Sequence, residues 1–136
     1  MKMTTKGKYA VSAMCELAQA FSDDRGKYLQ AKDIASRHFL SGLYVEQILN
    51  KLKRSKLVKA VRGPQGGYKL SRPPKNIKIS QILVATEGPI SIVSCVNGNE
   101  SEICKLSSKC KTVKFWSKLN SAIQNVLDET TLDDLC

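Results

Sequence analysis

Apolar residues recur at helical spacing in three segments of the first half of the chain. The apolar positions of the first segment, residues 8–22, are Val11, Met14, Cys15, Leu17, Ala18 and Phe21. A short helix is expected at 31–37. Between Gly42 and Arg54 the apolar residues form one stripe, at Val45, Ile48, Leu49 and Leu52. Ser41 precedes this stripe as a good N-cap, so the pattern predicts three amphipathic helices.

After residue 56 the pattern changes to two short β-prone segments, 57–61 and 68–70. They are separated by Arg62-Gly63-Pro64-Gln65-Gly66-Gly67, a glycine-rich stretch that is typical of a hairpin turn. Helices followed by a basic hairpin predict a winged helix-turn-helix, in which the helix at 42–54 enters a DNA groove and the hairpin is the wing. The expected fold is therefore mainly α with one small β-hairpin. Residues 1–75 are expected to form this domain.

Residues 76–136 have a different pattern. A short helix is expected from Ser80, as its cap, to Thr86, followed by a polar segment at 94–110 that holds three cysteines. A long helix is expected at 111–128, and residues 131–135 resemble a short capped turn. The long helix has an apolar stripe at Val113, Trp116, Leu119, Ile123, Val126 and Leu127.

The first domain already has its own small core, so little of the chain is left to cover this long apolar stripe. A second copy of the chain is the natural partner for it, because recognition helices usually work in pairs spaced one turn of DNA apart. The sequence therefore predicts a homodimer joined through the helix at 111–128. A stripe that faces the core of a single chain is the alternative.

Composition narrows the class of protein. The chain has 136 residues, of which 42% are hydrophobic and 25% charged, which suits a small protein and excludes a large multidomain enzyme. No apolar run approaches the ~20 residues of a membrane-spanning helix, and no signal peptide is complete. The sequence thus predicts a cytoplasmic protein without a membrane partner.

Charge is unevenly distributed along the chain. Residues 1–75 carry 16 Lys and Arg against 5 Asp and Glu, while residues 76–136 carry 6 against 7. The net charge of +10 thus comes entirely from the first half of the chain. A basic half joined to a near-neutral half favours a nucleic-acid-binding unit with a separate assembly or sensing unit. A merely solubilising basic surface is the alternative.

Candidate catalytic chemistry is sparse. The glycine-rich stretch joins strand to strand, whereas nucleotide-binding loops join strand to helix. His38 is the only histidine, which argues against a histidine-based triad or zinc site. A thiol oxidoreductase lacks the close cysteine pair of such enzymes. We therefore expect no enzyme and no small-molecule substrate.

Five cysteines occur in a chain with no export signal, which argues against a disulfide scaffold. Cys95, Cys104 and Cys110 share one polar segment, with eight and five residues between them. Three soft thiolates suit an iron-sulfur or zinc site, but such sites usually have four ligands, so one ligand is missing. Free thiols in a loop are the alternative. Cys15 is expected in the core, and Cys136 is expected to be incidental.

Three segments together resemble a known family. They are 3–11 (MTTKGKYAV), 44–49 (YVEQIL) and 57–70 (LVKAVRGPQGGYKL). The sequence is similar here to the IscR/NsrR/CymR family of bacterial winged-helix regulators, and the similarity continues through 87–90, 115–116 and 131–135. The three cysteines place it nearest the iron-sulfur-sensing, IscR-like branch.

The resemblance implies a dimeric transcriptional regulator, a repressor or activator, that binds an operator in double-stranded DNA. Family positions and the basic residues beside them give the expected DNA-binding set: Lys6, Ser41, Tyr44, Glu46, Gln47, Lys51, Arg62 and Gly63. The resemblance also implies that Cys95, Cys104 and Cys110 hold an iron-sulfur cluster, with 2Fe-2S favoured over 4Fe-4S.

The sequence departs from the family at the fourth ligand. The histidine that IscR-type members place three residues after the third cysteine is Val113 here, and the acidic ligand of NsrR-type members falls near Lys8. Glu100, Glu102, a small molecule or nothing could complete the site. Sensing by thiol oxidation, by zinc or through a partner protein remains the alternative to a cluster.

Overall fold

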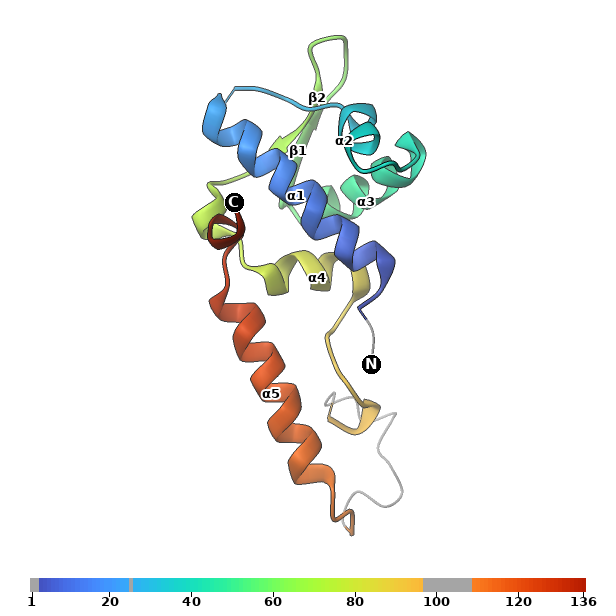
Figure 1. Ribbon diagram of the computed structural model, residues 1–136, viewed down its shortest axis with the longest axis vertical. Coiled ribbons are helices and arrows are strands. Elements are labelled where there is room, and N and C mark those ends of the chain that lie inside the picture. The colour runs from blue at the N-terminus through green and yellow to red at the C-terminus, as the bar shows by residue number, and fades with distance from the viewer. Residues whose placement is uncertain (1–2, 25, 97–108) are drawn as a thin grey trace.

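The computed structural model describes residues 3–24, 26–96 and 109–136 (Figure 1). The elements follow in chain order: α1 (Thr5–Asp23), α2 (Ala31–Arg37), α3 (Gly42–Arg54), β1 (Val58–Val61), β2 (Gly67–Leu70), η1 (Pro74–Asn76), α4 (Ile79–Glu87), η2 (Ser94–Val96), α5 (Val113–Glu129) and η4 (Leu132–Leu135). The prediction of a mainly helical fold with one small hairpin is confirmed. None of the helices formed by these residues combines the length and apolar character needed to span a bilayer.

One hydrophobic core joins the two parts of the chain. Met14 and Leu17 of α1 and Leu49 of α3 are almost fully buried in it, and so is Ile82 of α4. Leu132 of the closing turn has no exposed surface and belongs to the same cluster. Burying the apolar stripes of α1 and α3 therefore also fixes α4 and η4. The division at residue 75 stays a prediction.

The predicted stripes on α1 and α3 are correct, but α1 and α4 both begin earlier than expected. Helix α1 begins at Thr5, because Thr4 accepts a hydrogen bond from the Gly7 N–H at 3.2 Å. Ser80 does not cap α4. The helix begins at Ile79 after Lys78, whose backbone N–H donates to Gln81 Oε1 at 2.9 Å. Ser80 is buried within the first turn instead.

The hairpin pairs β1 with β2 antiparallel, with Val58 opposite Leu70 and Val61 opposite Gly67. A third segment joins it at Leu29, which exchanges two backbone hydrogen bonds of 2.8 and 2.7 Å with Tyr68. The hairpin is thus attached to the chain between α1 and α2, and its tip projects at one end of the molecule (Figure 1).

Helix α5 leaves this body and runs along the long axis of the molecule (Figure 1). Its C-terminal end is held by Asp128, which hydrogen-bonds Ser80 of α4 and Gln124 of its own helix. These bonds lower the pKa of the Asp128 carboxyl. The chain then returns through η4, where the Leu132 N–H donates to the Ile77 carbonyl at 2.8 Å. The short closing turn predicted at 131–135 is confirmed, with Thr131 as its cap.

Candidate nucleic-acid interface and cysteine segment

Helix α3 presents a polar face to solvent beside the hairpin. Glu46 and Gln47 are exposed, as expected for groove contacts. Ser41 is exposed too, but its hydroxyl accepts a hydrogen bond from the Tyr44 N–H at 3.1 Å and so caps the helix. Tyr44 is half-buried, with its ring edge-on to Tyr9 at 6.3 Å between centroids. Ser41 therefore caps α3 as the sequence predicts, and Tyr44 has a structural role that the sequence did not predict.

Three cations gather where α3 meets the start of α1. Lys6, Lys51 and Arg54 line one cavity of about 240 Å³ together with Gln47 and Asn50. The Lys6 side chain lies within hydrogen-bonding reach of Lys51, and together with its charge it lowers the pKa of the Lys51 amine. Such mutual repulsion is relieved when an anion binds between the cations, which makes this cavity a suitable seat for a DNA phosphate.

The hairpin places the two predicted wing residues at an exposed tip. Arg62 and Gly63 are both exposed, and Gly63 has a φ of 113°. A Cβ at Gly63 would meet no atom within 4 Å, so this backbone is open to solvent. The hairpin is tied to the recognition helix by Tyr68, whose hydroxyl donates to Asn50 Oδ1 at 3.3 Å. The tip and the polar face of α3 are thereby held as one surface.

Two exposed apolar side chains beside this surface were missed. Phe39 is 97% exposed in the turn between α2 and α3, and Leu43 is 67% exposed in the first turn of α3. Apolar side chains at such a position can contact the methyl group of thymine in the major groove. The stripe pattern places Leu43 on the outer face, but nothing in the sequence marked it as a contact. Phe39 has a positive φ of 56°, which periodicity does not reveal.

The turn that carries Phe39 is anchored to α1. Glu16 accepts from Arg37 Nη1 at 2.5 Å and contacts His38 Nε2 at 3.1 Å. His38 thus has a structural partner, Glu16 of α1, which holds the turn in place.

The cysteine segment is described at its two ends. Cys95 lies in η2 and is exposed, while Cys110 lies just before α5 and is half-buried. Cys104, like Glu100 and Glu102, lies outside the described residues. Within the described part of the chain, no three His, Cys, Asp or Glu side chains gather into a metal-binding group. The structure therefore places two of the three predicted sulfur ligands and leaves their joint geometry a prediction.

Hydrogen bonds activate the thiol of Cys110. Its Sγ lies 3.3 Å from Thr112 Oγ1, and the backbone N–H groups of Thr112 and Val113 also approach it. These hydrogen bonds, that of the Thr112 hydroxyl first, lower the pKa of the Cys110 thiol. A lowered pKa favours the thiolate, which is the form that binds soft metals and reacts with oxidants.

Thr112→Val is expected to raise the pKa of Cys110 and slow its alkylation by iodoacetamide at pH 7 by about two- to fivefold, since one hydrogen bond to the thiolate is worth ~0.5–1 kcal/mol. Thr112→Ser keeps the hydroxyl and is the matched control. Mass spectrometry of the Cys110 peptide over time gives the rate. Equal rates for the two variants would contradict this role of the hydroxyl.

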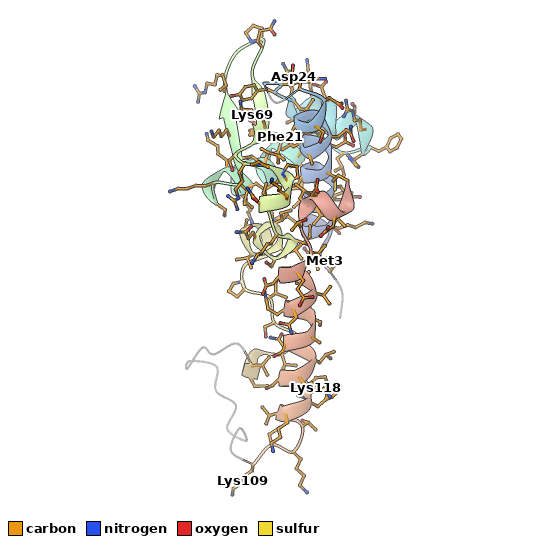
Figure 2. The ribbon with its side chains drawn as sticks, turned by 90° about the vertical axis from the view of Figure 1, so that its left-hand side faces the viewer. Met3, Phe21, Asp24, Lys69, Lys109 and Lys118 are labelled. Atoms are coloured by element: carbon orange, nitrogen blue, oxygen red, sulfur yellow. The ribbon has the colours of Figure 1, made fainter. Side chains whose placement is uncertain are left out.

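The end of the cysteine segment that precedes α5 lies far from the wing of the same chain. Lys69 of β2 and Lys109, which precedes Cys110, lie toward opposite ends of the long axis (Figure 2). The effect of a chemical change at Cys110 on α3 must therefore be transmitted over a long distance, for example along α5 or through a second protein molecule.

Helix α5 has no buried residue along its whole length. The predicted interface residues Val113, Trp116, Leu119 and Ile123 are half-exposed, and Val126 is 62% exposed. Leu127 packs against the core of its own chain. Phe115, 57% exposed and edge-on to Trp116 at 4.9 Å, adds apolar surface that the predicted stripe did not include.

Comparison with known proteins adds an independent observation to this geometry. The model of the Rrf2 family, described as iron-dependent transcriptional regulators, matches residues 3–136. The chain belongs to the Rrf2 family. This confirms the family predicted from the residues at 3–11, 44–49 and 57–70.

Relatives of this Rrf2 protein include regulators with different names. It is 39% identical over 135 residues to a putative HTH-type transcriptional regulator of Haemophilus influenzae, covering 99% of this chain and 86% of that one. The structure of CymR, described as the global cysteine regulator of B. subtilis, matches with a TM-score of 0.78 at 35% identity, covering 99% and 95% of the two chains. T. potens IscR matches with a TM-score of 0.74 at 36% identity, covering 99% and 85%.

This Rrf2 protein is accordingly a transcriptional regulator with a winged-helix fold. Its relatives are named as regulators rather than enzymes, in agreement with the weak sequence support for catalysis. Its structural neighbours thus include both a CymR and an IscR.

Proposed function

We propose that this Rrf2 regulator acts in the cytoplasm as a homodimer that binds an inverted-repeat operator in double-stranded DNA. Helix α3 enters the major groove of each half-site, and Arg62 at the wing tip reaches the adjacent minor groove. The residues proposed to contact DNA are Lys6, Ser41, Tyr44, Glu46, Gln47, Lys51, Arg62 and Gly63, with Leu43 and Arg54 added by the structure.

The observation that carries this proposal is the cation cluster of Lys6, Lys51 and Arg54 beside the exposed face of α3. Lys51 has no carboxylate within salt-bridge distance among the described residues, and its amine donates only to the Thr86 carbonyl, at 3.4 Å. Glu87 acts on Lys51 only from beyond salt-bridge distance. A DNA phosphate would bring negative charge into the cluster, and the cations would then be neutralised with release of counterions.

The apolar surface of α5 supports the dimer. A helix with Val126 and Phe115 exposed and no buried residue is covered well by a second copy, which meets it through the same surface. A dimer also presents two α3 helices to two half-sites. Size-exclusion chromatography with light scattering tests the dimer: a monomer at micromolar concentration would contradict it.

Arg62→Ala is expected to weaken operator binding by about 5- to 150-fold per half-site, the effect of ~1–3 kcal/mol from a lost base-edge or groove contact. The measurement is fluorescence anisotropy with a labelled operator, selected from a random library by the wild-type protein. Preference for the selected sequence over a scrambled one should fall in the same variant.

Two further variants make this test sharper. Lys51→Gln is expected to weaken binding to all sequences alike and to flatten the salt dependence by about one ion per subunit, because it removes a phosphate contact. Lys118→Gln removes an equal charge from the exposed surface of α5, far from the wing (Figure 2), and is the control. Arg62→Ala binding like the control would remove the wing from the interface.

For the signal, we propose that an iron-sulfur cluster on Cys95, Cys104 and Cys110 controls operator affinity. The donors suit the group in kind: they are soft thiols, and Cys110 has a lowered pKa and is accessible. When bound, the cluster would supply redox chemistry and join both ends of the segment between η2 and α5. The 2Fe-2S form is favoured by the resemblance to IscR.

The second candidate is a cluster-free regulator that responds through its thiols. The same lowered pKa of Cys110 favours it, since an accessible thiolate is also oxidised readily. Zinc binding or a partner protein are further forms of this candidate. Iron and sulfide content of protein purified without air separates the two candidates.

A further inference from the structure

Two cysteines far apart in the sequence meet where the closing turn packs on α1. The packing of η4 against α1 brings the thiol of Cys136 within hydrogen-bonding reach of the thiol of Cys15. The turn is held there by Leu132, which has no exposed surface, and by backbone bridging between Thr131 and Lys78. The two thiols therefore meet as a consequence of the core, and the chain end at Cys136 lies far from the start of α5 (Figure 1).

The two thiols have different surroundings. Cys136 is exposed and open to reagents in solution, whereas Cys15 is half-buried against the core. Burial is the main cause that raises the pKa of Cys15 to about 12, and the nearby Cys136 and Glu16 raise it further. A solvent-facing thiol beside a shielded one is the arrangement in which the first reacts with an oxidant and the second resolves the product.

We propose that Cys15 and Cys136 form a reversible intramolecular disulfide by exchange with a low-molecular-weight disulfide. The Cys136 thiolate attacks that disulfide, its S–S bond breaks, and one small thiolate leaves. The Cys15 thiol then loses its proton and attacks the Cys136 sulfur of the mixed disulfide. The second small thiolate leaves and takes up that proton. The two cysteines are oxidised and one small disulfide is reduced to two thiols.

This bond would connect two parts of the fold that the chain joins only at long range. Helix α1 supports the recognition helix, and η4 follows directly after α5. A disulfide between them closes a loop that includes nearly the whole chain and would fix the exit of α5 relative to the DNA-binding body. It would do so whether or not Cys95, Cys104 and Cys110 bind a cluster.

The test uses full-length protein in which Cys95, Cys104 and Cys110 are replaced by serine, so that only the proposed pair remains. After incubation with oxidised glutathione, the expected product is a single chain with no disulfide to another chain, which has lost both thiol hydrogens and has Cys15 and Cys136 in one cross-linked peptide. Thermal unfolding should shift upward by about 5 °C or more in this form, since the closed loop is long. Dithiothreitol should reverse both changes.

The matched controls are Cys15→Ser and Cys136→Ser in the same background. Cys15→Ser should stop at the mixed disulfide with glutathione, and Cys136→Ser should react at most slowly. In the protein that keeps both cysteines, the mixed disulfide on Cys136 should accumulate at pH 7. Its conversion to the Cys15–Cys136 disulfide should become about tenfold faster per pH unit up to pH 10, because Cys15 must lose its proton. A stable glutathione adduct on Cys136 at pH 10, or a disulfide between two chains, would overturn the proposal.

Discussion

Replacing Gly67 by alanine is expected to destabilise the protein by about 3 kcal/mol. Gly67 has a φ of 134°, and a Cβ there would lie 2.4 Å from the carbonyl oxygen of Leu29. That carbonyl accepts the Tyr68 N–H that joins the hairpin to the segment before α2. The variant must therefore adopt a strained backbone, at ~1–3 kcal/mol, and displace a bridge of two hydrogen bonds worth ~1 kcal/mol each.

Gly63→Ala is the matched control, because Gly63 also has a positive φ, of 113°, but has open space where a Cβ would lie. The free energy of unfolding of this variant should fall by only about 1 kcal/mol, the cost of a positive φ for alanine. Urea unfolding followed by circular dichroism gives both values. If the two variants lose equal stability, the close approach of Gly67 to Leu29 is not what requires a glycine at position 67.

These glycines show what the sequence could and could not reveal about the wing. The sequence indicated a glycine-rich hairpin turn and wing but did not show which contact each glycine of the tip makes. In the structure, a Cβ at Gly66 would lie 2.1 Å from the carbonyl of Val61, and Gly67 meets Leu29. Two of the three are therefore explained by contacts within the chain, and Gly63 alone is open for DNA. For Gly67 the cause is the Leu29 bridge, a long-range contact without a periodic signal in the sequence.

The helices were predictable because their stripes are regular and their ends are marked. Helix α2 and helix α3 have the predicted bounds, and the Ser41 cap is as expected. The start of α4 was wrong because Ser80 resembles a cap while Gln81 provides the hydrogen bond to the residue before the helix. Local capping preference is weaker than the packing that buries Ser80 against α5.

Long-range contacts could not be predicted from either end of the chain. Cys136 had no periodic context and seemed incidental, yet the burial of Leu132 brings it to Cys15. The same holds for the cation cluster, where Lys6 of α1 joins Lys51 and Arg54 of α3 only through the packing of the two helices. Charge along the sequence indicated the basic half but not this meeting point.

Protein purified and reconstituted without air is expected to bind iron and sulfide, and each of Cys95→Ala, Cys104→Ala and Cys110→Ala is expected to retain the cluster at least about tenfold less well. Loss of outer-shell partners alone costs ~10–100-fold in metal affinity, and these variants remove a ligand itself. Cys15→Ser and Cys136→Ser are the matched thiol controls and should bind as wild type. Iron and sulfide assays with the visible spectrum measure the result.

A substitution at Val113, the position of the missing fourth ligand, is expected to strengthen binding of the cluster. Val113 begins α5, three residues after Cys110, and its side chain cannot coordinate iron. Val113→His would place an imidazole where IscR-like proteins have one, and should slow loss of the cluster in air. If wild type takes up no iron, or the three alanine variants take up as much as wild type, the cluster proposal fails. The regulator would then sense through its thiols, with the accessible Cys110 thiolate as the first group to react.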